Sequence, residues 1–206
     1  MTGGQIIVVS APSGSGKGTV IKELLTIRPG AVPSVSYTSR APREGESEGV
    51  HYFFVSAGQF REMIENGVFV EWDLYQGDYY GTSSEKINQL LERGFEVVFD
   101  ITIKGAYAIR DYFPRAALVF LLPPSFAELE RRLRKRGSET EEKIAGRLAE
   151  ARREITSLEN FDYCIINDTV TEAAKKLDSI ITAEKLRVRK GGDGASAAVI
   201  NSVMEV

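Results

Sequence analysis

The residues best suited to chemistry form a glycine-rich segment near the N-terminus: Ala11, Pro12, Ser13, Gly14, Ser15, Gly16, Lys17, Gly18 and Thr19. An apolar run at residues 5–9 precedes the segment, and a helical pattern follows it. Small residues between a strand and a helix let successive backbone N–H groups face an anion, and the helix N-terminus adds positive potential. Lys17 can then reach the terminal phosphates. The segment predicts a nucleoside triphosphate site.

This segment departs from the usual phosphate-loop pattern G-x-x-x-x-G-K-[ST] at two positions. Ala11 stands at the first glycine, and Gly18 stands where the pattern has Ser or Thr. Thr19 follows one residue later and is a candidate magnesium ligand. A glycine-rich turn that only caps a helix is the alternative interpretation. The preceding strand, the lysine and the following helix together favour phosphate binding.

A second group of residues, within 36–54, is suited to a phosphate monoester. Arg40 and Arg43 lie three positions apart and carry forked donors that match a phosphate dianion. Ser36 and Tyr52 add hydroxyl groups nearby. From the residues alone, the arginines could equally be solvated loop side chains. A phosphate loop by itself names no reaction, because switches, motors and kinases share it.

The second segment resembles the guanylate kinase family of nucleoside monophosphate kinases. The chain matches the pattern T-[ST]-R-x-x-[KR]-x-x-[DE]-x-x-G-x-x-Y-x-[FY] completely from Thr38 to Phe54. Further resemblance lies in residues 69–72, 77–82, 122–125 and 166–168, so it covers about residues 5–186. It implies ATP with Mg²⁺ as phosphoryl donor, and GMP, with dGMP, as acceptor.

The resemblance also implies roles for residues on the acceptor side. It assigns the acceptor phosphate to Ser36, Arg40, Arg43, Tyr52 and Tyr80. Glu71 matches the carboxylate that accepts from guanine N1–H and the 2-amino group, and Thr82 matches the residue that reads O6. Adenine would leave a buried carboxylate unpaired, which costs on the order of 1–3 kcal/mol or more. Each role has a structural alternative. The tyrosines could only pack on a small sheet, Glu71 beside Trp72 could be a surface carboxylate, and Thr82 could serve only as a helix N-cap.

Residues 100–104 contain the chief departure from the family. Asp100 follows an apolar run, at the position where a Walker-B-like acid would hold magnesium through water; a strand-end turn residue is the alternative. The family has a second Asp two positions later that helps bind guanine, where this chain has Thr102. Thr102 is therefore the candidate guanine-binding residue at this position. Its neutral hydroxyl can accept a hydrogen bond but lacks the charge that roughly doubles the strength of such a bond. Lys104 is a new cation with no assigned role.

Residues 125–157 resemble the lid that closes over the triphosphate in this family. The matching positions of this lid hold Arg132, Arg136 and Arg147. The candidate catalytic residues are these three arginines together with Lys17, Arg40 and Asp100. Asn167 is a further candidate for binding ATP. The basic run at residues 131–136 could also be a solvated helix face or a nucleic-acid patch. Residues 128–154 contain nine basic and seven acidic residues, so no strongly positive surface is expected, which disfavours nucleic-acid binding.

The elements that must position these residues follow an alternating pattern. Short apolar runs at residues 5–9, 96–101, 117–122 and 163–166 lack alternation, which is typical of parallel strands buried on both faces. Capping signals at Ser56, Ser125 and Thr169, and within residues 82–85, precede helical patterns. Apolar residues recur at helical spacing from 144 to 158. The predicted class is α/β.

The predicted organisation is a phosphate-loop parallel-sheet core with two insertions. The core takes residues 1–35, 85–124 and 158–187, the GMP-binding subdomain with a small mixed sheet takes residues 36–84, and the helical lid takes residues 125–157. Gly, Asp and Ser after Arg189 predict a flexible tail at residues 188–206.

Composition narrows the remaining function classes. The 206 residues carry 26 basic and 29 acidic side chains, with a net charge of −3, one Cys and one His. A single cysteine excludes an internal disulfide and a multi-Cys zinc site, and favours a reducing cytoplasm. No apolar run spans a bilayer and the N-terminus does not read as a signal peptide. We expect a monomer or homodimer without nucleic-acid or membrane partners.

The predicted reaction is direct in-line transfer of the γ-phosphoryl group of ATP to GMP, in purine nucleotide metabolism. Two alternatives stay open. One is a kinase for another small phosphorylated acceptor, which Thr102 makes conceivable. The other is a non-catalytic guanylate-kinase-like module that binds a phosphorylated peptide, against which the intact Gly16 and Lys17 argue.

Overall fold

A computed structural model describes residues 3–75, 77–135 and 140–187 of the chain. Arg136 and the tail at residues 188–206, two of the sequence predictions, lie outside these residues. The elements in chain order are β1 (Gln5–Ser10), α1 (Lys17–Ile27), β2 (Ala31–Pro33), β3 (Ser36–Thr38), β4 (Tyr52–Phe54), α2 (Ala57–Glu65), β5 (Phe69–Tyr75), β6 (Asp78–Ser83), α3 (Ser84–Glu92), β7 (Glu96–Asp100), α4 (Ile103–Tyr112), β8 (Ala117–Leu122), α5 (Phe126–Lys135), α6 (Glu141–Ile155), the 3₁₀ helix η1 (Thr156–Asn160), β9 (Tyr163–Ile166) and α7 (Val170–Lys185).

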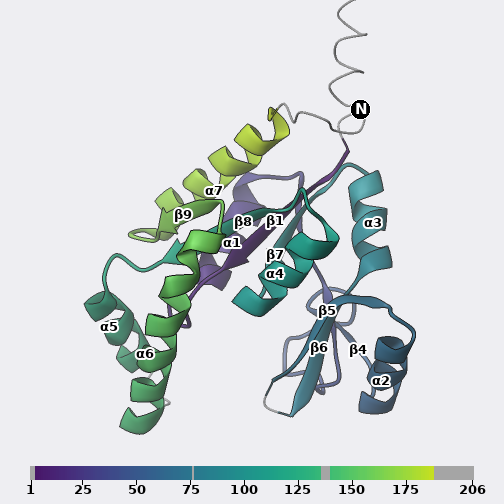
Figure 1. Ribbon diagram of the computed structural model, residues 1–206, viewed down its shortest axis with the longest axis horizontal. Coiled ribbons are helices and arrows are strands. Elements are labelled where there is room, and N and C mark those ends of the chain that lie inside the picture. The colour runs from purple at the N-terminus through teal and green to yellow at the C-terminus, as the bar shows by residue number, and fades with distance from the viewer. Residues whose placement is uncertain (1–2, 76, 136–139, 188–206) are drawn as a thin grey trace, which may run out of the picture.

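The core is a five-stranded sheet in the order β2-β7-β1-β8-β9, and every pairing in it is parallel. The middle residues of its central strands are apolar, as expected for strands whose two faces are both covered by helices. One face packs on α1 and α7, and the other packs on α3 and α4 (Figure 1). The predicted α/β class with a parallel core is confirmed.

Strand β1 lies between β7 and β8, so their carboxyl ends meet at one edge of the sheet. The glycine-rich loop leaves β1 at this edge, and Asp100 ends β7 there. The sequence missed β2, an edge strand that ends at Pro33. A proline is tolerated at that position because an edge strand needs fewer backbone donors.

A second sheet, in the order β4-β3-β6-β5, stands apart from the core and contains one parallel and two antiparallel pairings. Helix α2 packs on one face through Phe60, which stacks on Phe69 and Tyr79. The small mixed sheet was predicted from the resemblance and is confirmed. Helices α5 and α6 project from the core separately from this sheet (Figure 1).

Helices α5 and α6 pack on each other through a small apolar cluster that contains Leu129, Leu133, Ile144 and Ala151. The predicted stripe ends earlier than expected, because α6 stops at Ile155 and Leu158 lies in η1. Among the described residues, no helix is long and apolar enough to cross a bilayer.

Side-chain caps fix where several helices begin. Ser56 and Gln59 form a reciprocal capping box at α2, and Thr169 caps α7 as predicted. At α3 the N-cap is Ser83, whose hydroxyl accepts from Lys86 N. The alternative that Thr82 serves only as the N-cap is therefore wrong, and its side chain is left for the site.

Candidate active site

The glycine-rich loop presents an open helix N-terminus. Gly14 and Gly16 have φ values of 94° and 87°, which a residue with a Cβ rarely adopts. Gly16 is the N-cap of α1 and supplies no side-chain cap. The first N–H groups of α1 therefore remain available to an anion, which is the arrangement that binds phosphate.

Lys17 is held beside the loop by two oxygens from the end of β7. Its Nζ lies 2.8 Å from Asp100 Oδ1 and donates to the Ile101 carbonyl at 2.8 Å. Lys17 is mostly buried, whereas the Asp100 side chain is 48% exposed. The contact positions a cation at the carboxyl edge of the sheet, where the terminal phosphates of a bound nucleotide would lie.

Asn167 and Arg132 support the loop from behind. Asn167 Nδ2 donates to the Ser15 carbonyl at 2.8 Å, and Arg132 donates to the carbonyls of Ser15 and Asn167 at 3.3 and 3.1 Å. Ser15 Oγ and Asn167 Oδ1 are buried without a hydrogen-bond partner within the described residues. Buried polar atoms usually have partners, so both atoms are available to a polar ligand at this loop.

The lid helices already contact the loop. Arg147 on α6 donates to Ser13 Oγ at 3.1 Å, and a Cβ on Gly14 would lie 2.9 Å from Leu133 Cδ2 on α5. Arg132 also pairs with Glu128 at 2.7 Å, one helical turn away on α5. Two of the three predicted lid arginines, Arg132 and Arg147, are thus brought to the loop; Arg136 lies outside the described residues.

The predicted phosphate-binding arginines lie at the end of β3. Arg40 is mostly buried, and its Nη2 donates to both oxygens of Glu46, at 2.8 and 2.9 Å. The Arg43 backbone N–H donates to Glu46 Oε2 at 2.8 Å, while its side chain is exposed. Glu46 therefore orders the turn that carries both arginines.

Two tyrosines complete this side. The Arg40 guanidinium lies 5.5 Å from the centre of the Tyr52 ring, and the Tyr52 and Tyr80 rings meet edge to face at 5.9 Å. The rings pack on the small sheet, as the structural alternative expected, and they also flank Arg40. The two rings therefore help to hold the Arg40 side chain in place.

Three side chains from neighbouring strands form a hydrogen-bonded chain. Thr82 Oγ1 donates to Glu71 Oε1 at 2.6 Å, and Ser36 Oγ lies 3.1 Å from Thr82 Oγ1. Because the Thr82 proton is used on the carboxylate, Ser36 donates to Thr82. Burial, assisted by the charge of Asp73, raises the pKa of the Glu71 carboxyl, while Thr82 and Lys104 oppose that rise.

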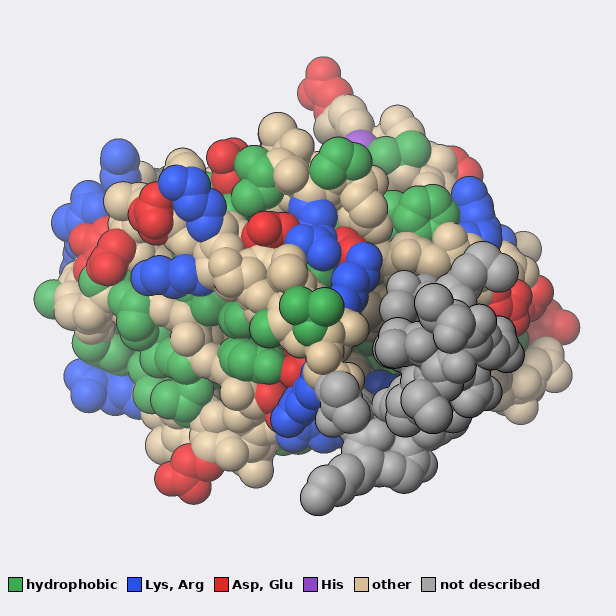
Figure 2. Space-filling view, turned by 90° about the horizontal axis from the view of Figure 1, so that it is seen from above, with side chains coloured by type: hydrophobic (Ala, Val, Ile, Leu, Met, Phe, Trp, Pro, Cys, Tyr) green, Lys and Arg blue, Asp and Glu red, His purple; other side chains and the backbone are tan. Residues whose placement is uncertain are grey.

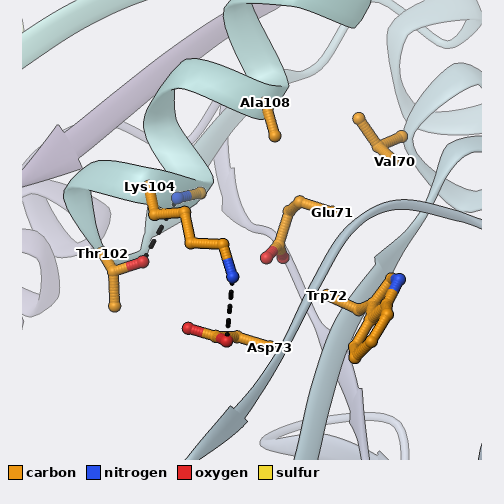
Figure 3. Close-up of a pocket in the computed structure, with 8 residues that line it drawn as sticks. Val70, Glu71, Trp72, Asp73, Thr102, Lys104 and Ala108 are labelled. Carbon is orange, nitrogen blue, oxygen red and sulfur yellow. Dashed lines mark hydrogen bonds and ion pairs between the residues drawn. The ribbon is translucent and has the colours of Figure 1, made fainter.

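A pocket of about 210 Å³ opens between β5 and α4 (Figure 3). Residues 70–73 of β5 line one wall, and Lys104, Gly105 and Ala108 of α4 line the other, with Thr102 at the start of the helix. Trp72 belongs to this lining, and its ring lies 6.2 Å from that of Tyr79. The volume suits part of a nucleotide, such as a base, rather than a whole one.

Thr102 lies in the pocket wall but its hydroxyl also caps α4, accepting from Gly105 N at 3.2 Å. Lys104, to which the sequence assigned no role, pairs with Asp73 at 3.1 Å. Sequence reasoning missed Asp73 and Glu46. Alternation along residues 69–75 could have placed Asp73 on the same face as Glu71, and Glu46 already stood at the acidic position of the family pattern.

The oxygens available near the loop suit a loosely held Mg²⁺. Lys17 contacts Asp100 Oδ1, while Oδ2 lies over Gly18, 3.5 Å from where a Cβ would be. Thr19 is exposed in the first turn of α1. Among the described residues, no group of three or more His, Cys, Asp or Glu side chains could hold a metal. One carboxylate fits an ion that is bound chiefly by substrate phosphates and water.

Comparison with known proteins agrees with this geometry. The family model described as guanylate kinase matches residues 3–184. The chain is 46% identical to a guanylate kinase of Escherichia coli (strain K12), over 92% of this chain and 93% of the relative. It is 44% identical to a guanylate kinase of Desulfitobacterium hafniense (strain Y51), over 91% and 94%.

A solved structure shares the fold as well. The crystal structure of guanylate kinase from Anaplasma phagocytophilum superposes with a TM-score of 0.73 at 32% sequence identity. The match covers 91% of this chain and 89% of that one.

Proposed function

The chain belongs to the guanylate kinase family, and from that premise we propose how its own residues bring ATP and GMP together. It is a phosphotransferase that converts GMP and ATP to GDP and ADP. One observation supports guanine as the base. The mostly buried Glu71 carboxylate accepts from Thr82 at 2.6 Å in a pocket that suits one base. We extend the proposal to dGMP, because none of the assigned contacts needs the 2′-hydroxyl group.

The donor side of the proposal rests on the loop from Ala11 to Thr19. Backbone N–H groups at the start of α1 bind the phosphates, and Lys17 reaches them from its position beside Asp100. Asn167 and Arg132 hold the loop in shape through the Ser15 carbonyl. Mg²⁺, with Asp100 and Thr19 as its nearest candidate ligands, would supply further charge neutralisation on the phosphates.

The acceptor side rests on the small sheet. Arg40 and Arg43 bind the GMP phosphate, and Ser36, Tyr52 and Tyr80 contribute hydroxyl donors. Glu71 accepts from guanine N1–H and the 2-amino group. The Thr82 hydroxyl, whose proton lies on Glu71 in this structure, would turn that proton to O6 when GMP binds. Thr102 borders this pocket as a neutral residue whose hydroxyl is partly committed to α4.

The chemistry needs no general base, because the acceptor phosphate has a second pKa of about 6 and is ionised at neutral pH. The main obstacle is repulsion between two anions. Like unit charges about 4 Å apart repel by roughly 4 kcal/mol at an effective dielectric of about 20. Lys17, Arg40, Arg43, Arg132 and Arg147 are positioned to offset this repulsion, and Arg136 joins them by sequence alone.

We also propose which parts of the chain bind the donor and the acceptor and which part forms the lid. Residues 1–35, 85–124 and 158–187 form the donor core, residues 36–84 carry the acceptor, and residues 125–157 close as a lid that excludes water. Contacts of Arg147 with Ser13 and of Leu133 with Gly14 support a lid that acts on the loop. Residues 188–206 remain a predicted flexible tail.

We further infer a cytoplasmic monomer or homodimer that binds neither nucleic acid nor membrane. Basic and acidic side chains are interspersed on the face seen in Figure 2, where a broad basic patch would favour nucleic acid. A net charge of −3 points the same way. The phosphopeptide-binding alternative is disfavoured because the loop with Lys17 is intact.

The decisive experiment compares acceptors in one coupled assay of ADP release with Mg²⁺ and ATP. GMP and dGMP should support turnover, whereas AMP and UMP should not at the same concentrations. Turnover with AMP or UMP as fast as with GMP would show that the pocket does not select guanine. Binding of GMP without any ADP release would favour a non-catalytic module.

A further inference from the structure

Three charged side chains meet at the pocket between β5 and α4. Glu71 and Asp73 are two residues apart on β5, so both side chains leave the strand on the same face. Lys104 reaches across from α4, with its Nζ 3.1 Å from Asp73 Oδ1. Figure 3 shows the Lys104 ammonium group lying between the two carboxylates. The pocket thus contains a second carboxylate beside the one already assigned to guanine.

The Asp73–Lys104 pair is poorly suited to a structural role. The side chains are 45% and 74% exposed, and exposed ion pairs add little to folding stability. The pair is nevertheless placed where two bodies meet, because β5 belongs to the small sheet and α4 to the core. Because both side chains line the pocket, a ligand that enters the pocket would lie beside them.

The donors on guanine outnumber the acceptors assigned so far. Its N1–H and exocyclic 2-amino group present three N–H donors along one edge. Glu71 Oε1 already accepts from Thr82 at 2.6 Å, and the Thr102 hydroxyl accepts from Gly105 N at 3.2 Å. Among the described side chains that line the pocket, Asp73 is the remaining carboxylate that can take the third donor.

Resting on the proposed function, we propose that Asp73 is a second base-reading carboxylate, which accepts a hydrogen bond from the 2-amino group of guanine. Lys104 is its positioning residue: it holds the Asp73 side chain against the wall of α4 and offsets the repulsion between two carboxylates on one strand face. Consistent with this, the Asp73 charge raises the pKa of the Glu71 carboxyl and the Lys104 charge lowers it.

The test compares GMP with inosine monophosphate, which differs only in lacking the 2-amino group. Asp73→Asn should lower kcat/KM for GMP about tenfold, since a charge-assisted hydrogen bond becomes a neutral one, and should change kcat/KM for inosine monophosphate less than about twofold. Lys104→Gln should give the same GMP-selective loss at about threefold. Most of each loss should appear in KM rather than in kcat.

Asp78→Asn is the matched control, because it removes the same charge from the far end of the same hairpin, outside the pocket lining. Its GMP to inosine monophosphate ratio should equal that of the unchanged protein. Thermal unfolding of all three variants should match the unchanged protein, since the pair is exposed.

Equal losses with both acceptors would overturn the proposal, because the pair would then act as a tether between the sheet and α4. Unchanged kinetics in Asp73→Asn would overturn it as well. Either result leaves the proposed function standing if the unchanged protein phosphorylates GMP. If the unchanged protein phosphorylates neither acceptor, the proposed function fails, and the role of Asp73 fails with it.

Discussion

The proposed donor site is built mainly from backbone groups, whereas the proposed acceptor pocket is built from side chains. The loop is fixed by Gly14 and Gly16 at positive φ and by a carbonyl bound to Asn167. The pocket depends on Glu71, Thr82 and Ser36, which come from three strands. The loop therefore depends on backbone shape, and the pocket depends on the ionisation and orientation of individual groups.

Removal of the loop cation should have the largest effect of any change at either region. Lys17→Ala should lower kcat at least about 10³-fold, because a cation that offsets repulsion in the transition state is lost. The fold should survive, since Asp100 is half exposed and can be solvated. Coupled ADP release measures the loss. Lys22→Ala, on the exposed side of the same helix, should leave the rate unchanged; near-normal turnover of Lys17→Ala would refute the loop assignment.

At the base pocket, a change of one atom should be nearly as damaging. Glu71→Gln should raise the KM for GMP about 100-fold and leave the KM for MgATP unchanged, because an amide replaces one acceptor oxygen by a donor. Initial rates against GMP concentration measure the shift. Glu65→Gln, exposed on α2, is the control. An unchanged GMP saturation curve in Glu71→Gln would contradict the base-reading role.

The same variant separates function from stability. Because the pKa of Glu71 is raised, the folded state favours the protonated acid. Protonation of Glu71 therefore adds to the free energy of unfolding below about pH 4.5, and this contribution is lost as pH rises through the raised pKa. Glu71→Gln should therefore unfold at a temperature no lower than the unchanged protein at pH 8. Thermal unfolding at pH 8 measures this difference and shows whether the ionised Glu71 carboxylate lowers the stability of the folded protein.

A backbone change should disturb the donor region with the opposite selectivity. Gly16→Ala forces φ of 87° on a residue with a Cβ and places that Cβ 2.7 Å from Asn167 Nδ2. We expect the KM for MgATP to rise about tenfold while the KM for GMP changes little. Gly146→Ala, where the helix has open space, is the control and should be slightly stabilising. A larger rise for GMP than for MgATP would remove the contrast between the two regions.

The smallest expected effect is a pH dependence confined to the acceptor side. Since burial raises the pKa of Glu71 above its ordinary 4.5, the KM for GMP should rise several-fold as pH falls from 7 toward 5. The GMP phosphate also titrates, near pH 6. Glu71→Gln retains only that second titration, so the two proteins should diverge below neutral pH. Parallel curves would show that Glu71 ionisation does not govern binding.

The contrast between the regions also explains what the sequence could predict. A phosphate loop is local, so residues 11–19 and the strand and helix around them could be assigned from one segment. The α/β core followed from its apolar runs. The small mixed sheet and Glu71 needed the family resemblance, because strands as short as β3 and β4 carry little periodicity of their own.

Other features could not be predicted because they depend on contacts between distant segments. Asp73 and Lys104 are 31 positions apart in the sequence, and each is an ordinary charged residue of a protein surface. Only the fold, which brings β5 beside α4, shows that they pair. Edge strand β2 has three residues and ends in Pro33, so no pattern identifies it. The sequence predicted only a guanine-binding role for the Thr102 hydroxyl. Its second role, as the N-cap of α4, depends on the exact residue at which that helix begins.

Trp72 is the only tryptophan in the chain. It lies between Glu71 and Asp73 on β5, so its indole leaves the strand on the opposite face, toward Tyr79, with 43% of its surface exposed (Figure 3). Its indole is therefore a built-in optical reporter. Emission excited at the red edge of protein absorption comes from this ring alone, without contribution from the eight tyrosines. A change in this emission when GMP is added to the unlabelled protein would report a movement of β5 and its neighbour Tyr79, rather than contact between the base and the ring.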